Sequence, residues 1–258
     1  MDNLNFKNIA DNLLDTFLYA GDVAKKTSRD GIKITIKEDK SPVTNGDLAV
    51  NKILSDKIFE LTPDIPIVSE ETVNQKKIKI ENNFWLIDPI DGTKDYIKKR
   101  DEYTLNAALI INLKPVIGII YAPEKDRLFF SYGKNLSFEI FKGNKESLNC
   151  KKKNKHEIVA LANSDNTPQE ILNIYKQNKV SKIIKMSSSL KFCVIAAGEA
   201  DIYAAKARAF EWDIAAGHAI LEHAGGFMTT HDNKKFDYGK KDYKNVPITA
   251  KRSKDLKT

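Results

Sequence analysis

Two aspartates, Asp88 and Asp91, stand at the end of an apolar run and share one tight turn. The run covers residues 84–87, and a proline and a glycine bend the chain directly after it. Two carboxylates without a nearby basic partner repel each other, and an apolar strand disfavours the charged form of both. A divalent cation would resolve both problems, and oxygen ligands suit Mg²⁺. The turn therefore predicts a metal site, to which the carbonyl oxygen of Ile90 could contribute.

Two other segments place acids beside apolar elements. Glu70 follows the apolar residues 67–69, and Asp213 comes immediately before an apolar helix. Each of these acids has a simpler interpretation. Asp88 could cap a turn, Glu70 could lie at a solvated strand end, and Asp213 could be a helix N-cap. Three such segments in one chain nevertheless favour a shared metal centre.

The elements that would position these acids change in type along the chain. Apolar residues at helical spacing predict helices over residues 4–25, 47–61, 168–177, 189–200 and 212–224. Strands at 104–111, 116–121, 128–132 and 137–141 follow one another closely, which indicates an antiparallel meander. After residue 155, short strands alternate with helices. We therefore expect an α/β (α+β) fold with two halves, residues 1–142 and 143–258, that form one unit.

The composition is that of an ordinary globular protein, with 258 residues, 41% of them hydrophobic and 30% charged. No apolar run approaches the roughly 20 residues of a membrane helix, and the start does not resemble a secretory signal. We therefore expect a soluble, cytoplasmic protein. The net charge is +7, but the lysines are scattered, which disfavours a nucleic-acid partner. Peripheral association with the inner membrane face stays open, as does the choice between monomer and homodimer.

Four segments together resemble the signature segments of the inositol monophosphatase superfamily. They stand in the family's order and at family-like separations, and they cover nearly the whole chain. They are Ser41-Pro42-Val43-Thr44-Asn45-Gly46-Asp47, Val68-Ser69-Glu70-Glu71, Trp85-Leu86-Ile87-Asp88-Pro89-Ile90-Asp91-Gly92-Thr93 and Glu211-Trp212-Asp213-Ile214-Ala215-Ala216-Gly217. The resemblance implies a layered αβαβα sandwich and a Mg²⁺-dependent phosphatase that acts on a small phosphate ester.

The resemblance also implies a role for each matching residue. Two or three Mg²⁺ ions would be held by four carboxylates and one carbonyl oxygen, those of Glu70, Asp88, Ile90, Asp91 and Asp213. Glu70 would take part in catalysis as well. Asp47 and Thr93 would orient the attacking water and remove its proton. The amides of Gly92 and Thr93 would cradle the phosphate.

A further segment, Ser188-Ser189-Leu190-Lys191-Phe192-Cys193, resembles the 3'(2'),5'-bisphosphate nucleotidase branch of the superfamily. In that branch the serines and the lysine contact a second phosphate, which implies this role for Ser188, Ser189 and Lys191. Arg208 stands near the position where inositol phosphatases carry a glutamate, and a cation there suits an anion better than a polyol. We therefore expect an adenosine bisphosphate substrate, 3'-phosphoadenosine 5'-phosphate, which is hydrolysed to AMP and phosphate.

Two other functions stay open from the sequence. The first is an inositol or other sugar monophosphatase with the same metal site. The second is a scaffold that binds RNA or transcription machinery, as some superfamily members do. The sequence departs from the family at Ser187, where glycine is usual, and at Gly46, where alanine is usual. These departures bear on the nucleotide contacts and leave the metal ligands in place.

Overall fold

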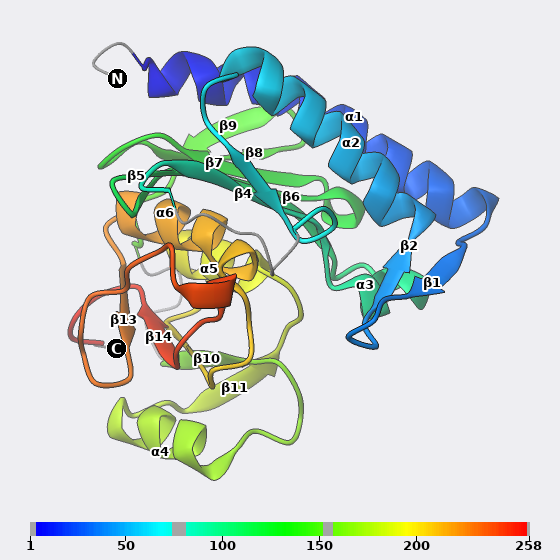
Figure 1. The fold of residues 1–258 in the computed structure, drawn as a ribbon. Helices are drawn as coiled ribbons and strands as arrows, with labels where there is room; N and C mark the ends of the chain where they lie inside the picture. Colours follow the sequence, from blue (N-terminus) through cyan, green and yellow to red (C-terminus); the bar gives the residue numbers. More distant parts are fainter. Residues whose placement is uncertain (1–3, 74–80, 152–156, 257–258) are drawn as a thin grey trace.

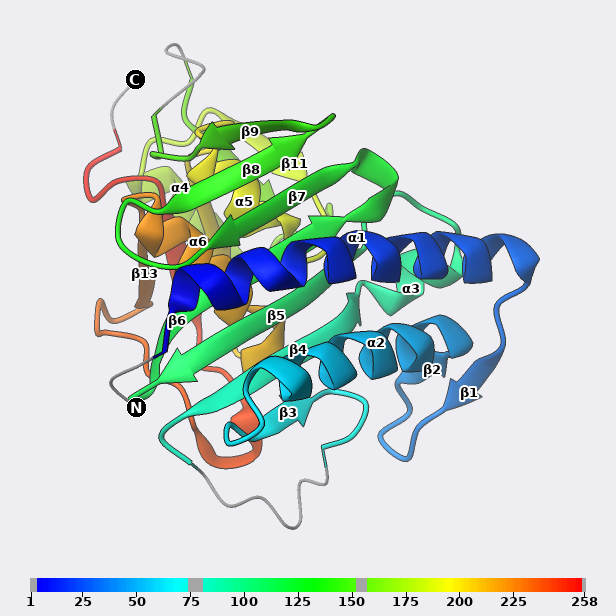
Figure 2. The same cartoon turned by 90° about the horizontal axis from the view of Figure 1, so that it is seen from above.

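The computed structural model describes residues 4–73, 81–151 and 157–256, which form five stacked layers (Figures 1 and 2). Helices α1 (Phe6–Asp30) and α2 (Asn45–Leu61) cover one face of a seven-stranded sheet. Helices α5 (Leu190–Ala196) and α6 (Ala215–His223) lie between that sheet and a five-stranded sheet. Helix α4 (Gln169–Gln177) covers the far face of the second sheet. This order is the expected αβαβα sandwich.

The seven-stranded sheet has the order β3-β4-β5-β6-β7-β8-β9. Its strands are β3 (Ile67–Ser69), β4 (Phe84–Asp91), β5 (Thr104–Ile111), β6 (Lys114–Ala122), β7 (Arg127–Ser131), β8 (Ser137–Phe141) and β9 (Asn144–Ser147). Strands β3 and β4 are parallel, and the neighbours from β4 to β9 are antiparallel. The predicted meander is therefore confirmed, and the sheet continues five residues past position 142.

Strand β4 is buried on both faces, which explains its uninterrupted apolar run. Trp85 and Ile87 pack in the cluster beneath α1 and α2. Phe84 and Leu86 point to the opposite side, into the cluster that contains α5 and α6. Since successive side chains of a strand alternate between faces, only a strand with two covered faces is apolar at every position. The acids at its end therefore emerge from a rigid, doubly packed element.

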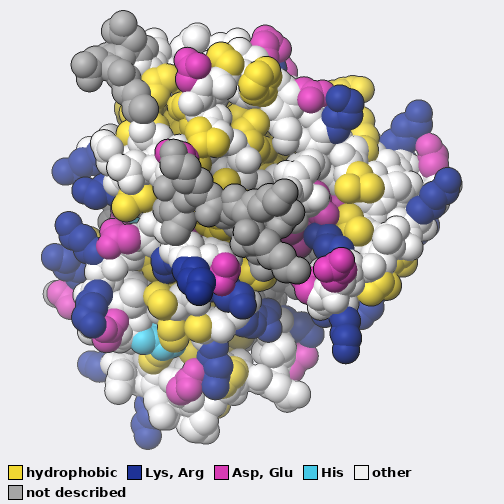
Figure 3. Space-filling model, viewed as in Figure 1, with side chains coloured by type: hydrophobic (Ala, Val, Ile, Leu, Met, Phe, Trp, Pro, Cys, Tyr) yellow, Lys and Arg dark blue, Asp and Glu magenta, His cyan; other side chains and the backbone are white. Residues whose placement is uncertain are grey.

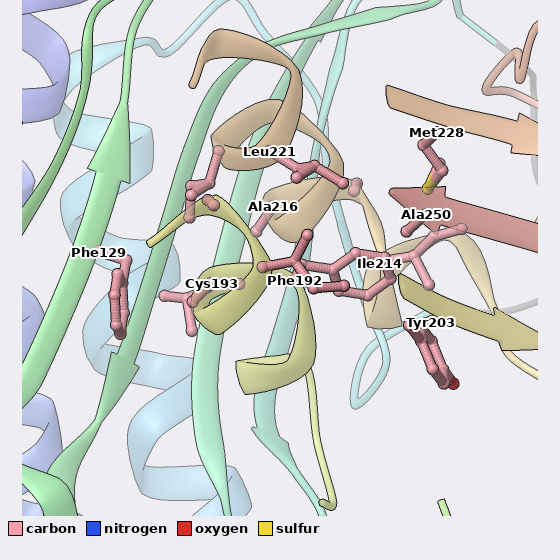
Figure 4. Close-up of a cluster of buried hydrophobic side chains, with 14 of the residues drawn as sticks. Phe129, Phe192, Cys193, Tyr203, Ile214, Ala216, Leu221, Met228 and Ala250 are labelled. Atoms are coloured by element: carbon pink, nitrogen blue, oxygen red, sulfur yellow. The ribbon is translucent and has the colours of Figure 1, made fainter. Parts of the chain in front are cut away.

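The five-stranded sheet has the order β11-β10-β12-β14-β13. Its strands are β10 (Val159–Ala162), β11 (Lys182–Lys185), β12 (Ile202–Ala205), β13 (Phe227–Thr230) and β14 (Ile248–Lys251). Strand β10 is parallel to β11 and β12, and β14 is antiparallel to β12 and β13. In Figure 4, Phe192 and Cys193 of α5 lie between Phe129 of the first sheet and Ala250 of the second. The two sheets thus share one hydrophobic core.

Smaller elements complete the fold near the end of β4. Strands β1 (Ile34–Ile36) and β2 (Pro42–Thr44) form an antiparallel ribbon that leads into α2. Helix α3 (Thr93–Ile97) follows β4 directly. Single turns of 3-10 helix occur at η1 (Pro123–Lys125), η2 (Glu211–Asp213) and η3 (Lys241–Tyr243).

Among the described residues, no helix combines the length and apolar character that a membrane crossing needs. On the face shown in Figure 3, lysine and arginine side chains are scattered among acidic and neutral ones instead of gathering in one stripe.

Helix α6 approaches the first sheet closely at Gly118 of β6. A Cβ atom at Gly118 would lie 2.8 Å from the Cβ of Ala219 and would also meet the carbonyl oxygen of Ala216. Both contacts belong to α6, so a side chain at Gly118 would push the helix away from the sheet. The helix begins two residues after Asp213, which couples this contact to the position of that acid.

We expect Gly118→Val to lower the free energy of unfolding by about 1–3 kcal/mol, since overpacking forces neighbouring elements apart. Urea denaturation followed by circular dichroism measures this change. Lys114→Ala, an exposed site on the same strand, is the control and should change stability by no more than about 0.5 kcal/mol. A Gly118→Val protein as stable as the control would show that α6 does not depend on this close contact.

Candidate active site

Asp88 and Asp91 are presented by an irregularity at the end of β4. The strand pairs with β5 in regular register up to Asp88, which faces Asn106, and the register then shifts before Asp91, which faces Thr104. A bulge of this kind bends a strand and redirects its side chains. It places both carboxylates at the same edge of the sheet.

Gly92 allows the chain to turn immediately after these acids. Its backbone has φ of 95°, in the left-handed region that favours glycine. A Cβ atom at this position would lie 3.2 Å from the carbonyl oxygen of Glu102. Helix α3 therefore starts at Thr93 without a gap, and the hydroxyl of Thr93 stays beside the turn.

Glu70 reaches the same edge because β3 runs parallel to β4. Ser69 is paired with Ile87, and the amide of Glu70 donates to the carbonyl oxygen of Ile87 at 3.1 Å. In two parallel strands, the residues that follow a paired position lie side by side. Glu70 and Asp88 are thus neighbours although 18 positions separate them in the chain.

Asp213 comes from the other half of the molecule, at the end of the turn η2. Its Oδ2 accepts from the amide of Phe210 at 2.8 Å, so it does cap a turn. The predicted single helix over 212–224 is wrong at its start, since that capping interaction closes a separate 3-10 turn before α6 begins. Glu211 points away and accepts from the amides of Gly239 and Lys240.

The three segments converge on one cluster. One carboxylate oxygen from each of Glu70, Asp88 and Asp213 lies within 4.8 Å of the other two. Asp88 is 1% exposed. Burial, followed by the charges of Glu70 and Asp91, raises the pKa of Asp88 well above its usual value. Burial and then the charge of Asp91 raise the pKa of Asp213 in the same way.

Buried polar atoms without hydrogen-bond partners lie beside the carboxylate cluster. Among the described residues, Oδ1 of Asp88, Oγ1 of Thr104 and Oδ1 of Asn106 are buried without a hydrogen-bond partner. Asp88 faces Asn106 across β4 and β5, and Thr104 faces Asp91. Buried polar atoms without partners are costly. Clustered carboxylate oxygens of this kind fit a hard divalent cation such as Mg²⁺.

Lys37, beside the β1–β2 ribbon, reaches the edge of this cluster. Its Nζ lies 3.3 Å from Glu70 and 2.9 Å from Glu71. Burial raises the pKa of Glu71 to about 7, against the opposing effect of Lys37. No sequence pattern indicates this contact, because Lys37 only continues the alternation of apolar and polar residues.

Asp47 and Thr93 form a second polar pair next to the acids. Thr93 Oγ1 lies 3.2 Å from Asp47 Oδ1 and 3.1 Å from the carbonyl oxygen of Ile90. Asp47 is 1% exposed and belongs to the capping box of α2, in which its Oδ2 accepts from the amide of Thr44 at 2.8 Å. Burial raises the pKa of Asp47, opposed first by the Thr44 hydroxyl. The aspartate is thus held rigidly with one oxygen toward Thr93.

A pocket of about 460 Å³ opens over the cluster. Most of the residues predicted for the site line it, namely Glu70, Asp88, Ile90, Asp91, Gly92, Thr93, Ser188, Lys191, Arg208 and Asp213. Asp47 and Ser189 are almost fully buried behind its wall. Asp47 contacts Thr93, and the hydroxyl of Ser189 donates to Asp91 Oδ2 at 2.6 Å. The structure therefore brings the predicted set together at one location.

Lys191 is a buried cation in the wall of this pocket, with 4% exposure. Its ammonium donates to the carbonyl oxygens of Met186 and Ser188 and lies 5.1 Å from the centre of the Tyr203 ring. Burial lowers the pKa of Lys191 to about 8, while the charge of Asp91 opposes this shift. Because an ammonium has three N–H donors, one remains for a ligand in the pocket.

Several other residues of the site were missed by sequence reasoning. Asn163 and Tyr203 line the pocket and hydrogen-bond to each other through their side chains at 2.9 Å. Thr104 and Asn106 lie against the acids from β5. A signal for the latter pair does exist, because they are the two polar residues of an otherwise apolar strand and lie two positions apart.

Comparison with known proteins agrees with this geometry. The model of the inositol monophosphatase family matches residues 8–256. A 3'(2'),5'-bisphosphate nucleotidase CysQ from Buchnera aphidicola is 40% identical over 209 residues, which are 80% of this chain and 78% of the relative. CysQ from Escherichia coli O157:H7 is 32% identical over 232 residues, 89% of this chain and 91% of that one.

A solved structure extends the agreement to the fold. The crystal structure of CysQ from Bacteroides thetaiotaomicron superposes with a TM-score of 0.79 at 29% identity and covers 96% of this chain and 98% of its own. The expected sandwich and the expected phosphatase family are therefore both confirmed. The chain belongs to the inositol monophosphatase family, a family of phosphatases.

Proposed function

We propose that this protein is a Mg²⁺-dependent 3'(2'),5'-bisphosphate nucleotidase, which hydrolyses 3'-phosphoadenosine 5'-phosphate to AMP and phosphate. One observation carries the proposal. The carboxylate cluster and the buried cation Lys191 line the same pocket, so a metal site and an anion site lie side by side. The relatives named CysQ support the same reaction.

We assign the metal ligands to the acids that converge at the end of β4. Glu70, Asp88 and the Ile90 carbonyl would hold one ion. Asp88, Asp91 and Asp213 would hold a second. Bound Mg²⁺ supplies Lewis-acid chemistry, since it acidifies water and neutralises charge on phosphate oxygens.

Asp47 and Thr93 would together remove the proton of the attacking water. Thr93 Oγ1 can accept that proton while its own proton passes to Asp47 Oδ1, which already lies within hydrogen-bond distance. A buried carboxylate with a raised pKa is suited to accept a proton. The backbone amides of Gly92 and Thr93, fixed by the left-handed turn, would hold the scissile phosphate in place.

The second phosphate of the substrate would bind on the opposite wall. Lys191 has an N–H donor free for it, and Ser188 lines the pocket next to this ammonium. Arg208 is exposed at the pocket rim, where a mobile cation can meet an entering anion. A bisphosphate needs such cations away from the metal ions, whereas inositol phosphate does not.

A second, smaller pocket adjoins the first and would hold the nucleoside. It has a volume of about 180 Å³ and shares Asn163, Ala205 and Arg208 with the main pocket. Apolar residues of α4 and its approach, Pro168, Ile171 and Tyr175, form part of its wall. We propose that the two halves, residues 1–142 and 143–258, act as one phosphatase unit, because each contributes to this combined cavity.

The substrate assignment predicts a strong preference among phosphate esters. We expect the purified protein to release phosphate from 3'-phosphoadenosine 5'-phosphate at a kcat/KM at least about tenfold above that for inositol 1-phosphate, and only when Mg²⁺ is present. A phosphate-release assay measures both. A preference for inositol 1-phosphate would favour the sugar phosphatase alternative, and salt-sensitive RNA binding without hydrolysis would favour the scaffold.

The metal assignment predicts a pH-dependent stabilisation by Mg²⁺. In the metal-free protein the acids have raised pKa values, so the stability that they contribute is present at low pH and is lost as the pH rises through the folded-state values. For Glu71 this range runs from 4.5 to about 7. We expect Mg²⁺ to raise the melting temperature more at pH 7.5 than at pH 5.

Asp88→Asn is the matched variant for this experiment. It removes a charge from the cluster without changing the size of the side chain. We expect the metal-free variant to be at least as stable as the wild type, to gain little stability from Mg²⁺, and to lose activity by roughly 100-fold. If Mg²⁺ stabilises the variant as much as the wild type at pH 7.5, Asp88 is not a ligand.

The assignment of Lys191 predicts a selective effect on substrate binding. We expect Lys191→Met to raise KM for the bisphosphate about tenfold, since a hydrogen bond to a charged group contributes about 1.5–3 kcal/mol. Adenosine 3'-monophosphate, which lacks the second phosphate, should show little change in KM. Initial-rate kinetics with both substrates measure the difference, and equal effects would remove the proposed role.

A further inference from the structure

One buried hydroxyl, that of Ser189, links the acids of the two halves. It lies 2.6 Å from Asp91 Oδ2 and 2.8 Å from the backbone carbonyl oxygen of Asp213. It also accepts from the amide nitrogen Nδ2 of Asn106 at 3.0 Å. Strands β4 and β5 and the turn η2 therefore meet at a single oxygen atom, which belongs to the N-cap residue of α5.

The direction of these hydrogen bonds follows from the number of protons. The Asn106 amide nitrogen can only donate, so the Ser189 oxygen accepts from it. The serine then has one proton to give, and the carboxylate oxygen at 2.6 Å is the stronger acceptor. Asp91 Oδ2 is thus engaged by the protein itself, which fixes the direction in which the other oxygen, Oδ1, points.

Both serines are buried, but their position relative to the pocket distinguishes Ser189 from its neighbour Ser188. Ser189 is 2% exposed and lies behind the pocket wall, whereas Ser188 lines the pocket. Ser188 has a φ of 55°, a left-handed conformation that turns the chain between the two serines. The two adjacent hydroxyls therefore face different surroundings, one open to a ligand and one closed.

We propose that Ser189 is a positioning residue for metal binding, held in its orientation by Asn106, and not a contact of the substrate. This inference rests on the proposed Mg²⁺ site. Ser189 restrains Asp91 from behind by donating its one proton, and its oxygen lies 2.8 Å from the backbone carbonyl oxygen of Asp213, so that Asp91 keeps a fixed place beside Asp213. Partners of this kind beyond the metal ligands commonly change metal affinity by 10–100-fold when they are removed.

The test is calorimetric titration of the protein with Mg²⁺ alone, without substrate. We expect Ser189→Ala to weaken Mg²⁺ binding by about tenfold or more, and Ser189→Thr, which keeps the hydroxyl, to restore much of it. At saturating Mg²⁺, the KM of Ser189→Ala for the bisphosphate should stay near the wild-type value. Unchanged Mg²⁺ affinity in Ser189→Ala would overturn the proposal.

Asn106→Ala provides an independent arm that leaves the serine in place. We expect it to weaken Mg²⁺ binding less than Ser189→Ala does, and the double variant to be no weaker than the serine variant, because both act through one hydroxyl. Additive losses would mean that Asn106 acts separately and would contradict its proposed role. Circular dichroism shows whether each variant is folded. If Ser189→Ala does not fold, the Mg²⁺ affinity of Asn106→Ala decides the test.

Two serine controls separate positioning from other effects. Ser131→Ala removes a buried hydroxyl of β7 that has no hydrogen-bond partner among the described residues, and should leave Mg²⁺ affinity unchanged. Ser188→Ala should give the opposite pattern to Ser189→Ala, with normal Mg²⁺ affinity and a raised KM. If the wild type itself binds no Mg²⁺, the metal assignment fails first and this inference fails with it.

Discussion

Repulsion among desolvated carboxylates is the constraint on which the rest of the structure depends. Glu70, Asp88 and Asp213 place oxygens within 4.8 Å of one another, and burial raises the pKa of each. Like charges at this distance disfavour the folded chain unless protons or a cation neutralise them. The fold must therefore hold the cluster together with stability gained elsewhere, chiefly in the shared hydrophobic core between the two sheets.

The sandwich supplies this restraint in three ways. Parallel pairing of β3 with β4 fixes Glu70 beside Asp88, and the bulge in β4 turns Asp91 to the same edge. Close packing on Gly118 holds α6, the helix that follows Asp213, against the sheet. The hydroxyl of Ser189 donates to Asp91 and lies 2.8 Å from the backbone carbonyl oxygen of Asp213. A site made of residues from both halves is thus as rigid as the core beneath it.

Many elements of the fold and several site residues were predictable from local sequence patterns. The remaining features depend on tertiary contacts, which a local pattern does not contain. The apolar run before Asp88 and the strands of the meander follow from alternation and turn residues, and they were predicted correctly. Helix α1 continues to Asp30, where Gly31 ends it, beyond the predicted end at residue 25. The prediction stopped early because the last turns of the helix are polar and continue no apolar spacing. Lys37 reaches the acids through tertiary contacts, which no local spacing encodes. The roles of individual site residues remain predictions.

The central claim is that the convergent acids hold divalent cations. The most direct measurement is anomalous scattering from crystals of the protein soaked in Mn²⁺, a cation that prefers the same oxygen ligands as Mg²⁺. The account predicts a strong anomalous peak in contact with carboxylate oxygens of Glu70, Asp88 and Asp213. A well-ordered cluster with no peak, or with peaks only at other surface acids, would contradict it.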